Sequence, residues 1–240
     1  MKGKATSFDI AYHAGVSQST VSRALRNSPL VSEETRKKIQ EIALELNYTV
    51  DKNASSLRSQ TSTTIALLLF EDPTSDDSLV NPFFLSMLGS ITRECSQQGY
   101  DLLVSFQELN ADWNSVFKDS NKADGLILLG YGDFKDYEEK LEQLVAHGTH
   151  FVRWGAETAG INTTSIGCDN FHGGQQITEH LISLDRKNFA FIGTANDHAP
   201  EFMARYQGHC HALEQAELVI NDELQINAVN TESAGFEAAN

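Results

Sequence analysis

Polar side chains with the chemistry of DNA contacts gather in a short stretch near the amino terminus. Their amide, hydroxyl and guanidinium groups are those that hydrogen-bond to base edges and phosphates in a major groove. With helical spacing, most of them share one outward face. The candidates are Gln18, Ser19, Ser22, Arg23 and Arg26, together with the hydroxyl residues Thr6, Ser17 and Thr20. This pattern predicts a surface that reads DNA.

The elements that must position these side chains are two short helices joined by a tight turn, within residues 6–26. Thr6 is predicted to cap the first helix, with Asp9 in the reciprocal position of a capping box. Gly15 stands where the turn needs a residue that tolerates positive φ. Ser17 is predicted to cap the second helix. The pattern is that of a helix-turn-helix.

Two ordinary helices of a larger domain are the alternative, and the following residues favour the helix-turn-helix. Val21 and Leu25, four residues apart, are expected to point inward from the second helix. A third helix is expected after Ser32, with acidic residues in its first turn. Its apolar stripe has the helical spacing i, i+3, i+4, i+7. The stripe consists of Ile39, Ile42, Ala43 and Leu46.

The segments DIAYHAGVSQSTVSRAL, VSEETRKKI and ELNY resemble the DNA-binding end of the LacI/GalR (lactose-repressor) family. The resemblance is dense over the first 58 or so residues. It implies a sequence-specific transcriptional regulator, expected to be a repressor, that binds a pseudo-palindromic operator as a homodimer. It also implies a small-molecule effector, expected to be a carbohydrate, that switches the affinity for the operator.

Residues 49–63 lack apolar periodicity and are rich in Ser, Thr and Asn, which by itself predicts a flexible linker. The family resemblance implies instead a hinge helix that lies in the minor groove, where a leucine wedges between base pairs. Leu57 would be that leucine, and Ala54 the small residue that allows close helix approach. Ser55 replaces a basic residue often found in relatives, and Arg58 completes the predicted contacts.

The remainder of the chain alternates apolar strands with helices, a pattern typical of doubly wound α/β folds with parallel sheets. The resemblance implies a periplasmic-binding-protein-like effector domain. The expected strands are 64–70, 101–106, 125–130, 151–154, 164–169, 189–193 and, more weakly, 223–226. The expected helices are 81–98, 113–120, 137–147, 173–184 and 201–215.

Four regions are therefore predicted, and the strand at 164–169 is expected to open the last sheet. They are a helix-turn-helix domain (1–48), a hinge or linker (49–63), and effector subdomains 64–160 and 161–240. In the family the effector domain continues with further strand–helix units, so the second subdomain is expected to be incomplete. A natural short variant is the alternative.

Ligands of such sheets bind at the carboxyl ends of the strands. The resemblance implies a sugar-type ligand between the subdomains, stacked on an aromatic ring. The candidates are Asn81, Phe83, Phe84, Arg153, Trp154, Asp169 and Arg205. Arg153 stands where many sugar-responding relatives carry Asp. Purely structural roles are the alternative for several of the others. Phe83 and Phe84 could be core residues, Asp169 could cap a helix, and Arg205 could be an ion-pair partner.

Charge is distributed unevenly along the chain. Residues 1–60 hold nine Lys and Arg against six Asp and Glu, whereas residues 61–240 hold nine against 27, for a total of −15. The acidic residues 61–240 should repel DNA, so DNA contacts are expected only in the basic residues 1–60.

No apolar run reaches membrane-spanning length, and no signal-peptide pattern is present. The cysteines Cys95, Cys168 and Cys210 are widely spaced, which is typical of a reducing cytoplasm.

Catalysis, cofactors and metals are not expected. His209, Cys210 and His211 resemble metal ligands in composition, but neighbours at i and i+2 point to different faces of a helix. No nucleophile, acid or base set can be assembled. Two rivals to a regulator remain open: a free-standing small-solute (sugar) binding protein of the same body fold, and a sugar-processing α/β enzyme.

Overall fold

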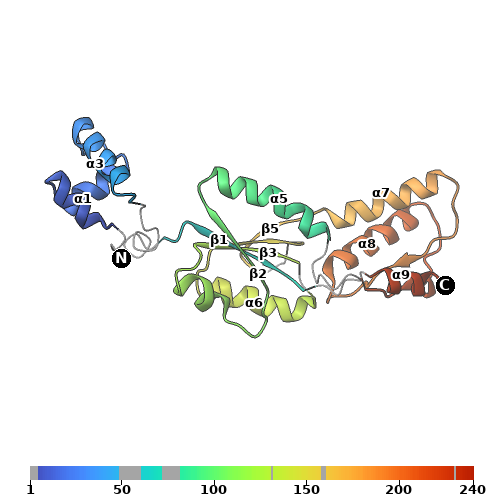
Figure 1. Cartoon of the computed structure of the whole chain (residues 1–240). Coiled ribbons are helices and arrows are strands. Elements are labelled where there is room, and N and C mark those ends of the chain that lie inside the picture. Colours follow the sequence, from blue (N-terminus) through green and yellow to red (C-terminus); the bar gives the residue numbers. More distant parts are fainter. Residues whose placement is uncertain (1–4, 49–60, 72–81, 131, 158–160, 230) are drawn as a thin grey trace. The chain divides into compact units, whose positions relative to one another are not determined.

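The computed structural model describes residues 5–48, 61–71, 82–130, 132–157, 161–229 and 231–240 (Figure 1). The chain divides into two compact units, residues 1–60 and 61–240. The predicted hinge residues Ala54, Ser55, Leu57 and Arg58, and the predicted pocket residue Asn81, lie outside the described residues.

The first unit is a three-helix domain, as predicted. Its helices are α1 (Ser7–Ala14), α2 (Gln18–Leu25) and α3 (Glu33–Glu45). They enclose a small core of Ile10, Ala11, Ala14, Val21, Ala24, Val31, Ile39 and Ala43. Leu25, Ile42 and Leu46 pack at its edge, partly buried. Ala24, which the pattern did not single out, is the residue that α2 buries fully beside Val21.

Local capping explains where these helices begin. The predicted capping box is confirmed, because Thr6 N–H donates to the Asp9 carboxylate at 2.8 Å and Asp9 N–H donates to Thr6 Oγ1. Ser17 caps α2 by accepting from Thr20 N–H. Gly15 ends α1 with φ 70°, the left-handed conformation that glycine adopts without penalty.

The second unit starts with a parallel five-stranded sheet of order β2-β1-β3-β4-β5. Its strands are β1 (Thr64–Leu69), β2 (Asp101–Phe106), β3 (Gly125–Leu129), β4 (Phe151–Trp154) and β5 (Thr164–Ile166). Between them lie α5 (Pro82–Gln97), the π-helical turn η1 (Asn114–Asp119) and α6 (Phe134–Ala146). Helices α5 and α6 cover opposite faces (Figure 1). We refer to residues 61–169 as the first lobe.

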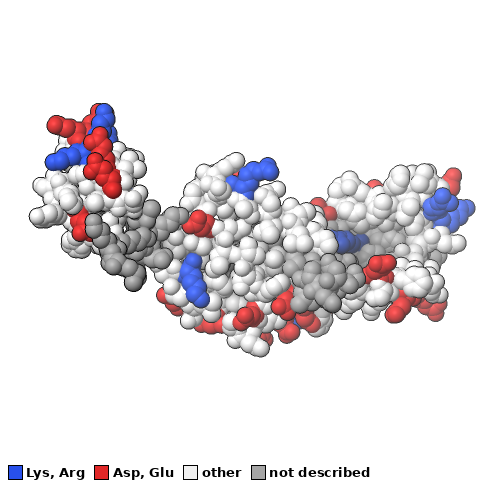
Figure 2. Space-filling view, in the orientation of Figure 1, with Lys and Arg blue, Asp and Glu red and all other residues white. Residues whose placement is uncertain are grey.

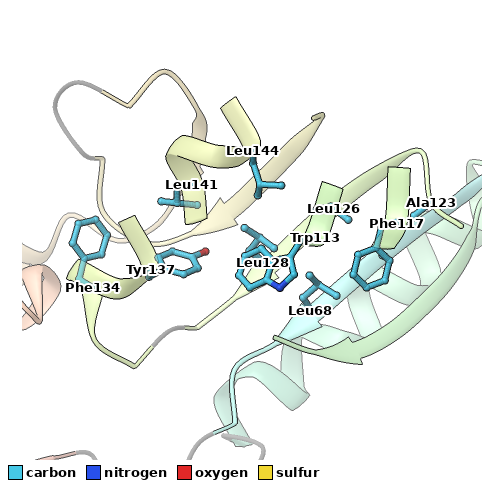
Figure 3. Packing of buried hydrophobic residues seen from close by; sticks show 11 residues of the cluster. Leu68, Trp113, Phe117, Ala123, Leu126, Leu128, Phe134, Tyr137, Leu141 and Leu144 are labelled. Atoms are coloured by element: carbon cyan, nitrogen blue, oxygen red, sulfur yellow. The ribbon is translucent and has the colours of Figure 1, made fainter. Parts of the chain in front are cut away.

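Successive residues of β1 face opposite sides of this sheet, and both sides are covered. Ala66 and Leu68 join the cluster shown in Figure 3, where α6 and the η1 region contribute large side chains. Leu67 and Leu69 face the other side, against α5. Burial on both sides explains why the segment is continuously apolar.

The expectation that 164–169 opens a second sheet is wrong. Thr164 pairs with Val152 and Ile166 with Trp154, so β5 completes the first sheet, and the strand stops at Ile166. Strand alternation predicts that a strand is present, but the sheet it joins depends on pairing between distant segments. A smaller difference is that α6 begins at Phe134, three residues earlier than predicted, because Asp133 caps it.

The second lobe, residues 170–240, consists of a helical pair and a short parallel β-ladder. Its elements are α7 (Asn170–Ser183), β6 (Phe191–Ile192), α8 (Pro200–Gln215), η2 (Asp222–Leu224), β7 (Gln225–Ile226) and α9 (Glu232–Ala239). Helices α7 and α8 lie side by side (Figure 1) and meet at two glycines. A Cβ at Gly174 would lie 2.1 Å from Arg205 O, and one at Gly208 would lie 1.9 Å from Phe171 O. The close helix contact therefore requires glycine on both sides.

Candidate nucleic-acid interface and ligand pocket

The candidate DNA-reading residues of α2 differ in how freely they are presented. Ser19, Arg23 and Arg26 are exposed, whereas Gln18 and Ser22 are half-buried. Gln18 Nε2 donates to Ser7 Oγ of α1 at 2.9 Å, which holds its amide against the neighbouring helix. Gln18 and Ser22 remain candidates for DNA contacts, but their side chains are less exposed than those of Ser19, Arg23 and Arg26.

Several of the remaining hydroxyl and guanidinium groups are held by neighbours on the same helix. Ser17 Oγ lies 2.8 Å from Ser19 Oγ and 2.9 Å from Thr20 Oγ1. Arg26 Nη2 donates to Ser22 Oγ at 2.6 Å. Among the described residues, the Arg23 guanidinium has no hydrogen bond or ion pair, so it is the group best presented for a new partner.

Helix α3 holds the other two helices in place from behind. Lys38 Nζ donates to the carbonyl oxygen of Ala14 at 3.1 Å, where the last turn of α1 leaves acceptors without helical partners. Gln40 Nε2 donates to Asn27 Oδ1, just after α2, at 3.1 Å. These bonds link α3 to the turn before α2 and to the region just after it, which gives α2 a fixed presentation.

The two units differ in charge as the sequence indicates. Figure 2 shows Lys and Arg side chains beside acidic ones on the three-helix unit. On the visible face of the second unit, acidic side chains gather along one margin. Acidic side chains repel the negatively charged phosphates of DNA. The first unit, which is less acidic, is therefore the part of the chain suited to approach DNA.

A cavity of about 450 Å³ lies between the two lobes, at the carboxyl ends of β3 and β4. Sheets of this kind bind their ligands at these ends. Its aromatic lining residues are Phe83, Phe84, Trp154 and Phe202. Its polar lining residues are Cys168, Asn170, Glu201 and Arg205.

Three aromatic rings form one wall of the cavity. The ring centroids of Phe83 and Trp154 are 5.5 Å apart, and those of Phe83 and Phe84 are 5.4 Å apart. Gly130, with φ 79°, allows the Phe84 ring to approach, because a Cβ there would lie 2.7 Å from Phe84 Cε2. A wall of this kind stacks on the apolar face of a ring-shaped ligand.

Three of the four polar lining residues, Asn170, Glu201 and Arg205, come from the second lobe. Arg205 Nε donates to Asn170 Oδ1 at 2.8 Å, and its guanidinium carbon lies 5.0 Å from the centroid of the Phe202 ring. These two contacts orient the guanidinium. Glu201 lies one turn earlier on α8 and accepts through Oε1 from Ala156 N–H of the first lobe at 2.9 Å. A carboxylate and a guanidinium together can bond ligand hydroxyls as acceptor and donor.

Two predicted pocket residues lie elsewhere. Arg153 is 1% exposed and does not line the cavity. Adjacent strand residues point to opposite faces, so Trp154 takes the pocket side and Arg153 takes the α6 side, over Phe134. Asp169 caps α7 by accepting from His172 N–H at 3.0 Å. It lines an adjacent groove beside that helix, which shares Cys168, Asn170 and Arg205 with the cavity.

Four of the lining residues named above, Cys168, Asn170, Glu201 and Phe202, were not among the predicted pocket residues. Glu201 and Phe202 precede Arg205 by one helical turn, so they share its face of α8. Asn170 directly follows Asp169, and its amide is the part of that segment that reaches Arg205. The helical spacing around Arg205 was the available signal.

In the described part of the chain, no three His, Cys, Asp or Glu side chains gather as metal ligands would. His209 is instead paired with Thr178, whose Oγ1 lies 2.9 Å from His209 Nδ1. Across the same residues, none of the helices combines the length and apolarity needed to cross a bilayer.

Comparison with known proteins identifies the family. Residues 8–51 match the family model described as "Bacterial regulatory proteins, lacI family". Residues 67–240, most of the chain, match the model "Periplasmic binding proteins and sugar binding domain of LacI family". The chain belongs to the LacI family.

Curated LacI-family relatives carry the names of regulators. The HTH-type transcriptional regulator MalR of Streptococcus pneumoniae is 35% identical over 191 residues, which cover 77% of this chain and 56% of MalR. The probable HTH-type transcriptional repressor ExuR of Bacillus subtilis is 30% identical over 230 residues, covering 96% and 66%. The chain thus spans little more than half the length of MalR.

Solved structures show the LacI-family fold. A lac repressor dimer bound to operator and the anti-inducer ONPF aligns with a TM-score of 0.74 at 21% identity, covering 98% of this chain and 68% of that one. A complex of the regulator CelR with cellobiose aligns with a TM-score of 0.62 at 22% identity, with the same coverage. A helical unit followed by a parallel-sheet α/β unit is therefore confirmed.

Proposed function

We propose that this LacI-family chain is a sequence-specific transcriptional regulator, acting as a repressor, whose affinity for operator DNA is switched by a small sugar-type ligand. The observation that carries the proposal is the cavity between the lobes, in a chain that also has a helix-turn-helix. An aromatic wall faces a guanidinium and a carboxylate there. A DNA-reading helix alone would need no such cavity.

The DNA-binding part of the proposal rests on α2. Arg23 is exposed at its outer face, and Arg guanidinium groups are the commonest specific readers of guanine in the major groove. Ser19 and Arg26 lie on or directly after the same short helix, where contacts to neighbouring bases and phosphates are within reach. We assign base reading to Arg23 and positioning on the backbone to its neighbours.

The hinge and the dimer belong to the same proposal. Leu57 would wedge into the minor groove at the centre of a pseudo-palindromic site, with Ala54, Ser55 and Arg58 beside it. Two copies would then place two α2 helices in successive major grooves. A homodimer on operator DNA, and with it a cytoplasmic place of action, follows from this arrangement.

The ligand part of the proposal rests on the chemistry of the cavity. Its volume of about 450 Å³ lies in the range of small-molecule sites. Sugars offer apolar ring faces to aromatic side chains and hydroxyls to charged groups, which matches the wall of Phe83 and Trp154 opposite Glu201 and Arg205. Two regulators of similar fold were solved with small ligands, CelR with cellobiose and the lac repressor with the anti-inducer ONPF.

Switching requires that the ligand bind two states of the protein with different affinity. The cavity has walls from both lobes, so a ligand that fills it favours one angle between them. That angle would change the spacing of the two DNA-binding units in a dimer. The pocket is assigned to regulation, and no reaction is assigned to it.

The test is a fluorescence anisotropy titration of the full-length protein with DNA from upstream of its own operon. We expect binding that requires the palindrome and weakens steeply with added salt. Adding mono- and disaccharides one at a time should then shift the operator affinity for at least one of them. Binding that is indifferent to the palindrome would contradict the regulator assignment.

A further inference from the structure

The Arg153 side chain is a buried cation where the two lobes meet. It is 1% exposed, and this burial lowers the pKa of its guanidinium. Burying a charge is costly unless hydrogen bonds or an aromatic face stabilise it. Nη2 donates to the carbonyl oxygen of Ala156, and the guanidinium carbon lies 5.8 Å from the centroid of the Phe134 ring. Both contacts stay within the first lobe.

The two contacted residues share a property that gives Arg153 a role beyond the core. Each donates its own backbone N–H to the second lobe. Ala156 N–H bonds to Glu201 Oε1 at 2.9 Å, and Phe134 N–H bonds to the carbonyl oxygen of His198 at 3.0 Å. His198 and Glu201 flank the start of α8. Two bonds that attach this helix to the first lobe therefore come from residues that Arg153 contacts.

The same end of α8 forms one side of the ligand cavity. Glu201 and Phe202 line it from the first turn of the helix. Trp154, the neighbour of Arg153 on β4, lines the opposite wall. Arg153 thus lies behind one wall and is linked through the Ala156 peptide to the other.

We propose that Arg153 is a positioning residue: by holding Ala156 and Phe134 it sets the angle between the lobes and hence the width of the cavity. It acts through these two segments and does not line the cavity. Its consequence for regulation rests on the proposed function, because the angle between the lobes affects DNA binding only in a ligand-switched regulator. The structural claim itself needs neither DNA nor effector.

Tryptophan fluorescence can measure the opening of the cavity in the intact chain. The chain has two tryptophans, Trp113 in the core and 3% exposed, and Trp154, half-buried in the cavity wall. Acrylamide added to the protein should therefore quench Trp154 far more than Trp113. A Trp154→Phe variant checks this assignment, because it should remove the quenchable fraction.

Substitutions at both ends of the Ala156 link then test the proposal. Arg153→Met keeps similar bulk but removes the donor, and should raise the Stern–Volmer constant roughly twofold as the open state gains population. Arg153→Lys keeps one donor nitrogen on a shorter side chain, so a smaller rise in the Stern–Volmer constant is expected. Glu201→Ala breaks only the bond to Ala156 and should raise quenching no more than Arg153→Met does, while Glu201→Gln keeps an acceptor and should quench like the wild type.

The double variant Arg153→Met/Glu201→Ala is decisive. Because Glu201 bonds only one of the two segments that Arg153 holds, the double variant should quench no more than Arg153→Met alone. Independent, additive increases, or unchanged quenching in Arg153→Met, would overturn the proposal. Should Arg153→Met not fold, Arg153→Lys combined with Glu201→Ala decides by the same comparison. Quenching results that contradict the role of Arg153 would leave the regulator proposal standing. Absence of operator binding would contradict that proposal but would leave the quenching results valid.

Discussion

His198 Nδ1 lies 2.6 Å from Asp133 Oδ2, in a contact that joins the start of α6 in the first lobe to the loop before α8 in the second. A parallel ion pair joins Lys135 Nζ and Asp197 Oδ2 at 3.1 Å. All four side chains are exposed, and each contact alone is therefore weak. Together with the backbone bond of Phe134 to His198, they form a clasp between the lobes.

The clasp should lose strength in acid. The hydrogen bond from His198, and then the one from Lys135 N–H, lower the pKa of Asp133 below its ordinary 3.8. A carboxyl whose pKa is depressed in the folded state stabilises that state above its ordinary pKa, and this is lost as the pH falls through the lowered value. We expect Asp133→Asn to melt below the wild type at pH ~7 and alongside it in strong acid.

Asparagine is chosen at position 133 because it still caps α6, so the substitution isolates the clasp. Asp136→Asn, an exposed substitution in the first turn of the same helix, is the matched control for helix-dipole effects. If the two variants show the same pH profile of the melting temperature, the contact with His198 is not the source of the difference.

Arg23→Ala should relax base preference. Loss of a bidentate guanidinium contact to guanine reduces discrimination by roughly ten- to a hundredfold at one base pair. The measurement is anisotropy on operator duplexes that vary at each position in turn. Lys37→Ala removes the same charge from α3, where Lys37 pairs with Glu33, and should leave the base preference unchanged. Equal preference profiles for Arg23→Ala and the wild type would remove Arg23 from base reading.

Gly15→Ala should destabilise the three-helix unit by about 1 kcal/mol, because an L side chain is strained at its φ of 70°. Gly15→Asn should cost less, since Asn tolerates this conformation. Gly89→Ala on α5 is the control and should raise the free energy of unfolding, because its Cβ meets nothing within 4 Å and alanine favours the helix. Urea unfolding followed by circular dichroism compares the three, and a neutral Gly15→Ala would contradict the strain argument.

Arg205→Lys should weaken ligand binding about tenfold, because lysine keeps the charge but loses both the bond to Asn170 and the stacking on Phe202. Titration calorimetry with the sugar that shifts operator binding measures the change. Gln207→Ala, a substitution on the same helix at a residue that does not line the cavity, is the control. Unaltered affinity in Arg205→Lys would mean that the guanidinium does not contact the ligand.

Leu57→Ala should reduce the DNA bend if Leu57 is the minor-groove wedge. Circular-permutation gels report the bend angle directly. Leu44→Ala, which shortens an exposed leucine on α3, serves as the control and should bend DNA fully. A full bend with Leu57→Ala would refute the wedge assignment.

The helix-turn-helix was the most predictable part of the chain, because its determinants are local. The Thr6–Asp9 capping box, the left-handed Gly15 and the Ser17 cap each involve residues a few positions apart. Their effects follow from backbone geometry and do not depend on distant packing. Most strands and helices of the second unit were predicted within a few residues for the same reason.

The pocket was predictable only in outline. The segments that carry Phe83, Trp154 and Arg205 were identified, since strand ends and helix starts in an α/β chain meet at one edge. The predicted side chains Phe83, Phe84, Trp154 and Arg205 do line the cavity, but Asn170, Glu201 and Phe202 were not predicted. Glu201 accepts from a residue 45 positions away, and no local pattern encodes that distance.

The sequence by itself determined the family, the DNA-reading helix and the order of strands and helices, because capping, turn conformation and hydrophobic period act over a few residues. Tertiary structure alone decided that β5 joins the first sheet and that Gln18 is tied to Ser7. It also decided that Arg153 lies behind the pocket wall. These outcomes depend on strand pairing and on which face is buried, and both are set only when segments far apart in the chain pack together.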